Sequence, residues 1–351
     1  MSGGVDSSVA ATLLKEAGHD LIGVTMSLLP HVDGKNGDNG VGENQVPEAV
    51  VKVKEVAVKL GIPHHAIDFQ EIFQEKVIAD FCREYFLGRT PNPCVRCNRY
   101  VKFGALLEKA RELGADFIAT GHYARIQRDE ATGRYLLKKG ADTEKDQSYF
   151  LCQLNQGQLA QAIFPVGGLT KDRVRQIAIA IDLPAADRPE SQEICFITDD
   201  DYIRFLKNQM PDAYRPGPII DEEGNTIGEH RGIPAYTIGQ RRGLGIAAPE
   251  PLYVTAIYPE RNAVAVGPKE KTYRRELIAN NLNWIASPPE QTVNVKARVR
   301  YRHKEAEATV TPTANDTVHV LFQEPQMAIT PGQTVAFYDG DTVIGGGTIN
   351  L

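Results

Sequence analysis

The feature that most constrains this chain is a glycine-rich run at its start that leads directly into a helix. The run reads Ser2-Gly3-Gly4-Val5-Asp6-Ser7-Ser8, and residues 9–17 continue it with an apolar-faced helical pattern that Gly18 can end. Two glycines allow the backbone to approach an anion closely, and the start of a helix favours negative charge. The run therefore predicts a phosphate-binding loop.

This loop differs from the Walker A motif. The spacing Gly-x-x-x-x-Gly-Lys-Ser/Thr is absent, and no lysine follows the glycines. That difference argues against the usual transfer or hydrolysis of a terminal phosphate. The alternative is a glycine turn with a Ser or Asp helix cap, but the whole seven-residue run at a helix start favours phosphate binding.

Strands and helices alternate through the first third of the chain. Short apolar runs predict strands over 21–26, 62–69 and 115–120, and longer patterns predict helices over 47–60, 70–86 and 98–113. Such alternation indicates an α/β fold, in which a parallel sheet is covered on both faces and binds ligands at the carboxyl ends of its strands.

Beyond about Asp200 the pattern changes to frequent turns and short alternating segments. These segments predict strands at 252–257, 263–266, 293–301, 317–322 and 334–338. We therefore expect an α/β domain over 1–204, followed by two small β-rich domains over 205–272 and 273–351.

Composition excludes several classes of protein. The 351 residues are 42% hydrophobic, and no window approaches the roughly 18 uncharged apolar residues of a membrane span. Gly3, Gly4 and Asp6 stand where a signal peptide would need an apolar run, so we expect a cytoplasmic protein with no membrane association. The net charge of −6 argues against indiscriminate nucleic-acid binding but leaves room for a local basic face.

Two of the five cysteines form a Cys-x-x-Cys pair, Cys94 and Cys97. Pro91 and Pro93 bar a helix until after the second proline, so Cys97 is expected near the start of a helix from Asn98, where the dipole favours thiolate. Half of a structural zinc site is the alternative. The chain has no second Cys-x-x-Cys to complete one.

The other three cysteines give weaker signals. Cys195 lies between Ile194 and Phe196, and from these neighbours alone a buried, inert cysteine is the favoured interpretation. Cys82 and Cys152 lie within apolar patterns and are also expected to be inert.

A basic segment near residue 300 is a candidate nucleic-acid surface. Residues 296–304 alternate basic and mostly apolar side chains, so a strand here would place five cations on one face: Lys296, Arg298, Arg300, Arg302 and Lys304. Such a row suits a phosphate backbone. The alternative is a solvated edge strand guarded by its charge.

The glycine-rich loop resembles the pyrophosphate-binding loop of the ATP pyrophosphatases, enzymes that release pyrophosphate and leave AMP on a substrate oxygen. Within that superfamily, the chain resembles the tRNA-specific 2-thiouridylases over nearly its whole length. The motifs that carry the resemblance are Thr90–Asn98, Gly121–Ala124, Lys145–Phe150, Ser191–Phe196, Tyr236–Leu244 and Pro331–Gln333.

The resemblance implies an adenine-nucleotide alpha hydrolase-like catalytic domain that uses ATP and Mg. ATP would adenylate the position-2 oxygen of the wobble uridine of tRNA. Cys195 would carry a persulfide received from a sulfur-relay donor protein, and Cys97 would attack it and end in a disulfide with Cys195.

The resemblance also implies binding residues. The loop residues Ser2, Gly3, Gly4, Val5, Asp6, Ser7 and Ser8, with Met26 and Gly121, match nucleotide-site positions. Asn92, Pro93 and Cys94 match positions that face the target base. The matches to tRNA contacts are His122, Lys145, Asp146, Gln147, Arg300, Tyr301 and Gln333. Asp146 cannot attract phosphate, so we expect it to order a neighbouring base or residue. We interpret His122 as a contact residue rather than a catalytic base.

One departure from the family pattern opens a second sulfur route. Many relatives carry Asp where this chain has Cys94, and there the carboxylate is assigned acid–base work. With Cys94, Cys97 and Cys195, three thiolates would instead hold an iron–sulfur cluster with one open iron, and sulfide bound there would be the donor. The sequence leaves both routes open.

Two other functions remain as alternatives. One is another ATP pyrophosphatase ligase acting on a small molecule, which would have no use for three cysteines or a basic strand. The other is a catalytically impaired tRNA-binding relative that lacks its first strand, because Met1 immediately precedes the loop that a buried strand normally presents. A start codon assigned too late would explain the same observation.

Overall fold

The computed structural model describes residues 1–29, 48–183, 194–197, 199–211 and 214–351. The chain divides into two compact units. The first contains residues 1–74, 98–148 and 156–196, and the second contains residues 75–97, 149–155 and 197–351. Each unit is therefore assembled from separate stretches of the chain.

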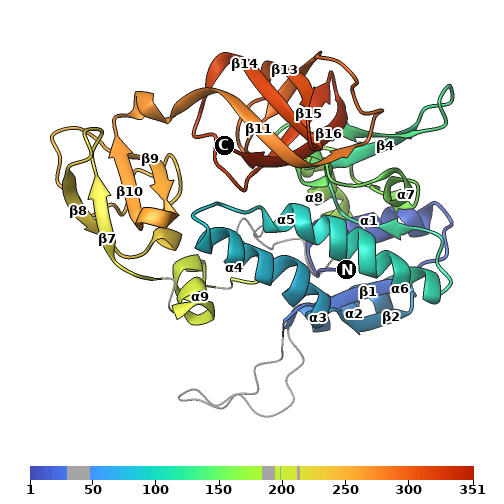
Figure 1. The fold of residues 1–351 in the computed structure, drawn as a ribbon. Helices are drawn as coiled ribbons and strands as arrows, with labels where there is room; N and C mark the ends of the chain where they lie inside the picture. Colours follow the sequence, from blue (N-terminus) through green and yellow to red (C-terminus); the bar gives the residue numbers. More distant parts are fainter. Residues whose placement is uncertain (30–47, 184–193, 198, 212–213) are drawn as a thin grey trace, which may run out of the picture. The chain divides into compact units, whose positions relative to one another are not determined.

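The first unit contains helices and short parallel strands (Figure 1). β1 (Gly23–Ser27) pairs in parallel with β2 (His64–Asp68), and β3 (Ile118–Ala119) pairs in parallel with β6 (Ala162–Ile163). The helices include α1 (Val5–Glu16), α2 (Glu48–Leu60), α7 (Gln156–Leu159) and α8 (Lys171–Ala180), and β4 (Ala124–Arg128) forms a hairpin with β5 (Tyr135–Lys139). The predicted α/β fold with parallel strands is confirmed.

Apolar side chains from several elements hold the phosphate loop in place. Val5 and Val9 of α1 pack with Val56 of α2 and Val174 of α8 in one buried cluster. Because Val5 belongs to the glycine-rich run itself, burying it fixes the start of α1. Gly18 follows α1 with a φ of 85°, a conformation suited to glycine at the end of a helix.

The helix that carries the cysteine pair begins earlier than predicted. α5 (Pro93–Arg96) starts at the second proline and continues through a π-helical segment (Cys97–Ala105) into α6 (Leu106–Glu112). The prediction of a start at Asn98 is wrong because proline is well tolerated at the first helical position, where its missing N–H would have no helical partner. Upstream, α3 (Gln70–Phe73), a π-helical turn (Gln74–Ile78) and α4 (Ala79–Phe86) cover the other predicted helix.

The second unit includes a small mixed sheet that follows α9 (Tyr202–Gln209). Its strand order is β8-β7-β10-β9, comprising β8 (Thr226–His230), β7 (Gly217–Ile220), β10 (Ala263–Gly267) and β9 (Tyr253–Tyr258). Ile219, Val254 and Val264 are fully buried at its centre. We call residues 217–267, which span this sheet, the central module.

The rest of the second unit includes an antiparallel β-barrel (Figure 1), which pairing of six strands closes. Its strands run in the order β11-β14-β13-β12-β15-β16, and pairing of β11 with β16 closes it. They are β11 (Tyr273–Trp284), β14 (Thr317–Met327), β13 (Ala306–Thr313), β12 (Val293–Arg298), β15 (Thr334–Asp339) and β16 (Thr342–Asn350). Val310, Val320 and Phe337 are among its fully buried core residues.

The basic segment forms a shorter strand than predicted. β12 ends at Arg298, and residues 299–303 form a bend and turn. Lys296 pairs with Glu307 of the neighbouring strand at 3.4 Å. The predicted single-faced row of five cations is therefore wrong beyond Arg298, because the strand alternation on which it depends stops there.

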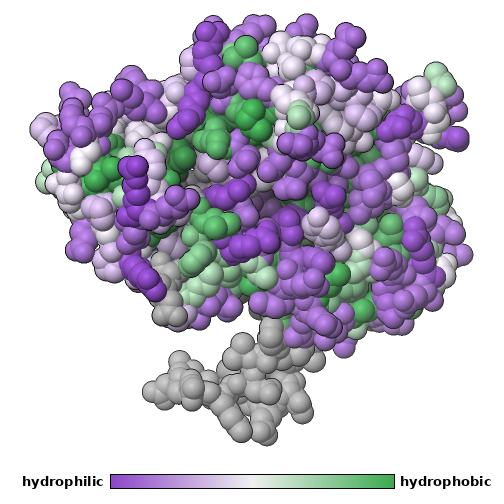
Figure 2. All heavy atoms as spheres, viewed as in Figure 1, coloured by the Kyte–Doolittle hydropathy of each residue, from purple (hydrophilic) through white to green (hydrophobic). Residues whose placement is uncertain are grey.

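Hydrophilic side chains cover most of the face seen in Figure 2, with apolar residues in smaller groups. Among the residues that the structure describes, no helix is long and apolar enough to cross a membrane.

Candidate active site

The glycine-rich loop is arranged to receive an anion at the start of α1. Gly4 is the N-cap residue, and no side chain in the described part of the chain caps the helix start. Gly3 has a φ of 75°, which favours glycine, and the Ser2 and Ser7 hydroxyls lie 3.2 Å apart. Ser8 is fully buried and donates to the Gly4 carbonyl, so its hydroxyl shapes the loop. These features fit the phosphate groups of a nucleotide.

Gly121 packs directly against this loop. A Cβ at this position would lie 2.7 Å from the Asp6 carbonyl carbon and 2.8 Å from the Ser7 nitrogen. Only glycine therefore allows the residue 121 backbone to approach the helix start so closely. Met26, the other predicted nucleotide-site residue outside the loop, lies partly buried on β1.

A buried lysine pairs with the loop's only carboxylate. The Lys171 ammonium lies 2.7 and 2.9 Å from the two carboxylate oxygens of Asp6. Its side chain is 8% exposed, against 32% for Asp6. The Tyr123 hydroxyl donates to Asp6 at 2.7 Å, and the Lys171 ammonium lies 5.6 Å from the centre of the Tyr123 ring. A cation and a hydroxyl thus offset a negative charge that would otherwise repel phosphate.

Lys171 is not among the site residues predicted from the sequence, although its position carries a signal. Thr170 caps α8 by accepting from the Arg173 amide, which makes Lys171 the first residue of that helix. A cation there opposes the helix dipole. A lysine directly after an N-cap residue is therefore unfavourable unless a carboxylate lies nearby, and Asp6 provides that carboxylate.

Two predicted tRNA contacts hold the backbone next to Tyr123. Gln147 accepts from the Tyr123 amide through its side-chain oxygen at 3.0 Å and donates its own amide to the Tyr123 carbonyl at 2.8 Å. Asp146 is 4% exposed and accepts from the Gly140 amide, the Ser148 amide and the Ser148 hydroxyl. Asp146 thus orders neighbouring residues, one of the two roles expected for it. Lys145 lies partly buried just before them.

His122 is buried in an aromatic environment. Its ring packs against Phe103 and Phe164, with ring centroids 6.0 and 5.7 Å away, and its Nδ1 lies 2.7 Å from the Thr120 hydroxyl. Burial, reinforced by the Lys102 ammonium, holds the pKa of His122 well below its usual value. The imidazole is therefore neutral at physiological pH.

Cys195 is an exposed residue beside a buried aromatic side chain. The next residue, Phe196, is buried and packs edge-on against Phe73 at 5.7 Å. Desolvation by surrounding atoms raises the pKa of Cys195, and the Lys102 ammonium acts in the opposite direction. The burial favoured from its neighbours alone is therefore wrong for Cys195, and its reactivity stays a prediction. Of the motif before it, residues 191–193 lie outside the described residues.

Cys94 and Cys97 differ in exposure. Asn92 is the N-cap of α5 and accepts from the Val95 amide at 3.3 Å. Cys94 is exposed in the first turn of that helix, whereas Cys97 lies one turn further along and is buried. The dipole at the helix start therefore acts most directly on Cys94. Cys82 and Cys152 are buried as expected, and burial raises the pKa of Cys82 to about 11.

The predicted tRNA contacts in the barrel make protein contacts in this structure. Arg300 donates to the Thr330 hydroxyl at 2.5 Å and to the Ile238 carbonyl at 2.9 Å. Tyr301 packs on Phe150, with ring centroids 4.4 Å apart. Gln333 donates to the backbone carbonyls of Thr90 and Pro91, the two residues before Asn92. These side chains and the Asn92–Cys94 segment belong to the same unit.

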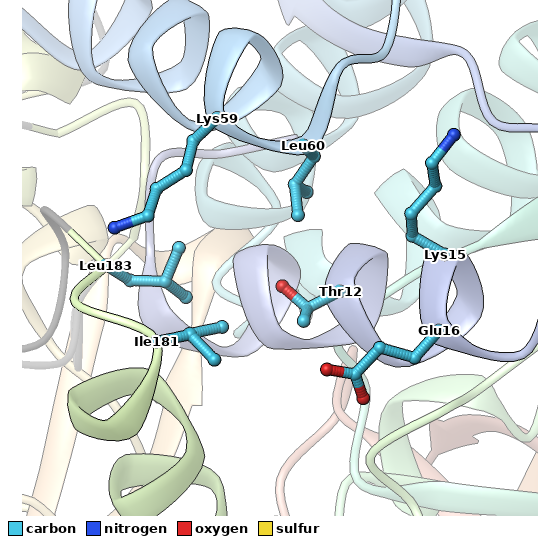
Figure 3. Close-up of a pocket in the computed structure, with 7 residues that line it drawn as sticks. All are labelled: Thr12, Lys15, Glu16, Lys59, Leu60, Ile181 and Leu183. Atoms are coloured by element: carbon cyan, nitrogen blue, oxygen red, sulfur yellow. The ribbon is translucent and has the colours of Figure 1, made fainter.

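A separate surface pocket of about 240 Å³ lies at the other end of α1 (Figure 3). It is lined by Thr12, Lys15, Glu16, Lys59, Leu60, Ile181 and Leu183. None of the predicted site residues lines it, so we assign it no part in the chemistry. Within the described ranges, no group of three or more His, Cys, Asp or Glu side chains is placed to hold a metal ion.

Comparison with family models matches three segments of the chain. Residues 1–199 match a model described as the tRNA methyl transferase HUP domain. Residues 203–268 match a PRC-barrel domain and residues 274–349 an aminomethyltransferase β-barrel domain. The fold and the loop thus define a HUP-type α/β domain followed by two β-rich modules.

Curated relatives identify the family within this class. A tRNA-specific 2-thiouridylase MnmA from Heliobacterium modesticaldum is 51% identical over 99% of this chain and 91% of its own length. Another, from Caldanaerobacter subterraneus, is 53% identical over 99% of this chain and 96% of its own length. The chain belongs to the tRNA-specific 2-thiouridylase family. A solved U34-tRNA thiolase from Methanococcus maripaludis, at 20% identity, covers 60% of this chain and 65% of its own with a TM-score of 0.33, too low to support an argument.

Proposed function

We propose that this protein is a tRNA-uridine 2-sulfurtransferase that uses ATP to replace the position-2 oxygen of the wobble uridine with sulfur. The observation that carries the proposal is the uncapped helix start at Ser2–Ser8, a phosphate site in a chain whose relatives are named 2-thiouridylases. A loop of this kind without a Walker lysine suits release of pyrophosphate and adenylation of an oxygen.

The loop residues would hold the ATP phosphates, together with Mg. The backbone at Gly3 and Gly4 and the Ser2 and Ser7 hydroxyls offer donors to phosphate oxygens. Asp6 is the carboxylate that can ligate Mg, and Lys171 keeps it from repelling the phosphates when no metal is bound. Once the uridine oxygen attacks the α-phosphorus, the same donors and Lys171 would stabilise the departing pyrophosphate.

In the persulfide route, Cys195 carries the sulfur to be transferred, and Cys97 releases that sulfur from Cys195. The terminal persulfide sulfur bonds to uridine C2, the bond from C2 to the adenylated oxygen breaks, and AMP leaves. The Cys97 thiolate then attacks the Cys195 sulfur, which releases the transferred sulfur to the base and leaves a Cys97–Cys195 disulfide. In the alternative route, an iron–sulfur cluster would be held by Cys94, Cys97 and Cys195 and would supply an open iron for sulfide.

The proposal includes two macromolecular partners and a division of labour. The substrate is tRNA, and the persulfide route requires a sulfur-relay donor protein to load Cys195. We propose that residues 1–204 carry the chemistry and that the β-rich domains over 205–272 and 273–351 position the tRNA.

The central test measures 2-thiouridine directly. The protein is incubated with unmodified tRNA, ATP and Mg, and with either a persulfide donor (for the persulfide route) or inorganic sulfide (for the cluster route). The digested nucleosides are then analysed by mass spectrometry. We expect 2-thiouridine only when ATP is present, with AMP and pyrophosphate formed together. Cys82→Ala serves as a control that retains activity. Absent thiolation with intact tRNA binding would replace this proposal with a tRNA-binding role, whereas ATP-independent thiolation would overturn the adenylation step.

The two sulfur routes are separated by metal content and by cysteine variants. After anaerobic purification, iron and acid-labile sulfide are assayed in the wild type, Cys94→Asp and Cys195→Ser. The cluster route predicts iron in the wild type and its loss in both variants. The persulfide route predicts an active, iron-free wild type, activity in Cys94→Asp, and no activity in Cys195→Ser.

A further inference from the structure

The segment that precedes the cysteine pair is held by both β-rich parts of the second unit. We call Arg89–Cys94 the base loop, a name that rests on the proposed function of its Asn92–Cys94 portion. The Thr90 amide donates to the Pro331 carbonyl at 2.8 Å, and the Thr90 hydroxyl lies 3.1 Å from that of Thr237. Pro331 belongs to the barrel sequence and Thr237 to the central module, so the base loop connects the two.

Gln333 makes the most specific of these contacts. Its side-chain nitrogen donates to the Thr90 carbonyl at 3.0 Å and to the Pro91 carbonyl at 3.1 Å. A glutamine amide has two N–H donors, so both are used by the base loop. Pro91 and Pro93 lack amide hydrogens, which limits how this stretch can be held by its own backbone. The carbonyl groups of this stretch therefore depend on hydrogen-bond donors from other segments of the chain.

The turn that carries Gln333 is shaped for close approach to the base loop. Gly332 has a φ of 88°, and a Cβ there would lie 3.0 Å from both the nitrogen and the oxygen of Thr90. Arg300 fixes the residue before the turn by donating to the Thr330 hydroxyl. Gln333 also pairs with β16 through its backbone, because its carbonyl accepts from the Ile349 amide at 2.8 Å. The Gln333 side chain thus extends from a rigid support.

We infer that Gln333 is a positioning residue that holds the base loop through Thr90 and Pro91 and thereby sets the position of Asn92, the N-cap of α5. In this state Gln333 has no N–H left for another acceptor. A phosphate or base oxygen would gain its amide only by releasing the base loop. Gln333 thus links binding of a phosphate or base at the barrel to the geometry of α5, the helix that carries Cys94.

The test uses hydrogen exchange without tRNA, so its outcome is independent of the proposed function. Gln333→Glu replaces the donor with an acceptor that repels the two carbonyls, and Gln333→Met keeps the side-chain length without a donor. Gln323→Glu, at an exposed position on β14, is the matched control for the added charge. We expect exchange of the Thr90 amide to rise about tenfold or more in both Gln333 variants, because one or two hydrogen bonds are lost.

Barrel amides in β15 and β16 report on folding in the same samples. Faster exchange at Thr90 with unchanged β15 and β16 amides supports the inference. Unchanged exchange at Thr90 in both Gln333 variants overturns it, as does acceleration in Gln333→Met that is equal across the whole barrel. With tRNA and ATP, a positioning role further predicts a lower kcat for 2-thiouridine formation. A contact limited to tRNA binding would raise KM alone.

Discussion

The pair between Lys171 and Asp6 supports the sharpest prediction, made by replacing Lys171 with methionine. Methionine keeps most of the buried stem but removes the ammonium that lies within 2.9 Å of both Asp6 oxygens. Removing one partner of a fully buried ion pair costs about 3–5 kcal/mol. Because Asp6 is 32% exposed and keeps the Tyr123 hydroxyl, we expect a smaller loss of about 2 kcal/mol.

The assay must report on the first unit. Trp284 is the only tryptophan and lies on β11 of the barrel, so its fluorescence does not follow this pair. Hydrogen exchange of amides in α1 and α8 does, and a loss of about 2 kcal/mol corresponds to roughly 30-fold faster exchange. Binding of ATP should weaken by at least about tenfold, because an unpaired carboxylate then faces the phosphates.

Lys59 provides the matched control. It pairs with Asp182 at 3.3 Å, but the two side chains are 41% and 103% exposed. Lys59→Met should therefore cost between about 0 and 1 kcal/mol and leave ATP binding unchanged. If Lys171→Met accelerates exchange no more than Lys59→Met, the buried pair does not hold the phosphate loop and the reasoning is wrong. Asp6→Asn in the Lys171→Met background should recover part of the lost stability, because no unpaired charge remains.

Three further predictions concern other residues. Burial depresses the pKa of His122 in the folded state, so the unfolded state binds the extra proton and stability falls as pH drops below about 6.5. His122→Gln should flatten this dependence in thermal unfolding between pH 7.5 and pH 5; an unchanged slope would contradict the assignment. Gly332→Ala should destabilise the barrel by at least about 1 kcal/mol, followed by Trp284 fluorescence, because φ is 88° and Thr90 leaves no room for a Cβ; a neutral result would show that the turn can move. Thr170→Ala should cost about 1 kcal/mol through loss of the α8 cap, seen as faster exchange in α8 but not in α2.

Local signals in the sequence predicted the architecture well. The glycine-rich run, the alternation of strands and helices, and the change to short β segments near Asp200 each depend on residues close together in the chain. The errors have local causes too. Proline at the first position of α5 began a helix where proline was expected to prevent one, and the basic alternation continued past the point where β12 ends at Arg298.

The contacts that organise the site were beyond sequence reasoning because they join residues far apart in the chain. Lys171 and Asp6 are separated by 165 positions, and Gln333 and Thr90 by 243. No periodicity or motif spacing encodes such a pair. Only the resemblance to a known family drew attention to Gln333, as a tRNA contact, and nothing in that resemblance suggested its bonds to the base loop.

These two long-range contacts share a physical logic. In each, the segment expected to bind substrate cannot satisfy its own polar groups: the phosphate loop carries a carboxylate, and the base loop contains two prolines that donate no hydrogen bond. A side chain from a distant, well-packed element supplies the missing partner, Lys171 from α8 in one case and Gln333 from the start of the β15–β16 hairpin in the other. Variants at these two positions should therefore impair the site while the motifs that identify the family remain intact.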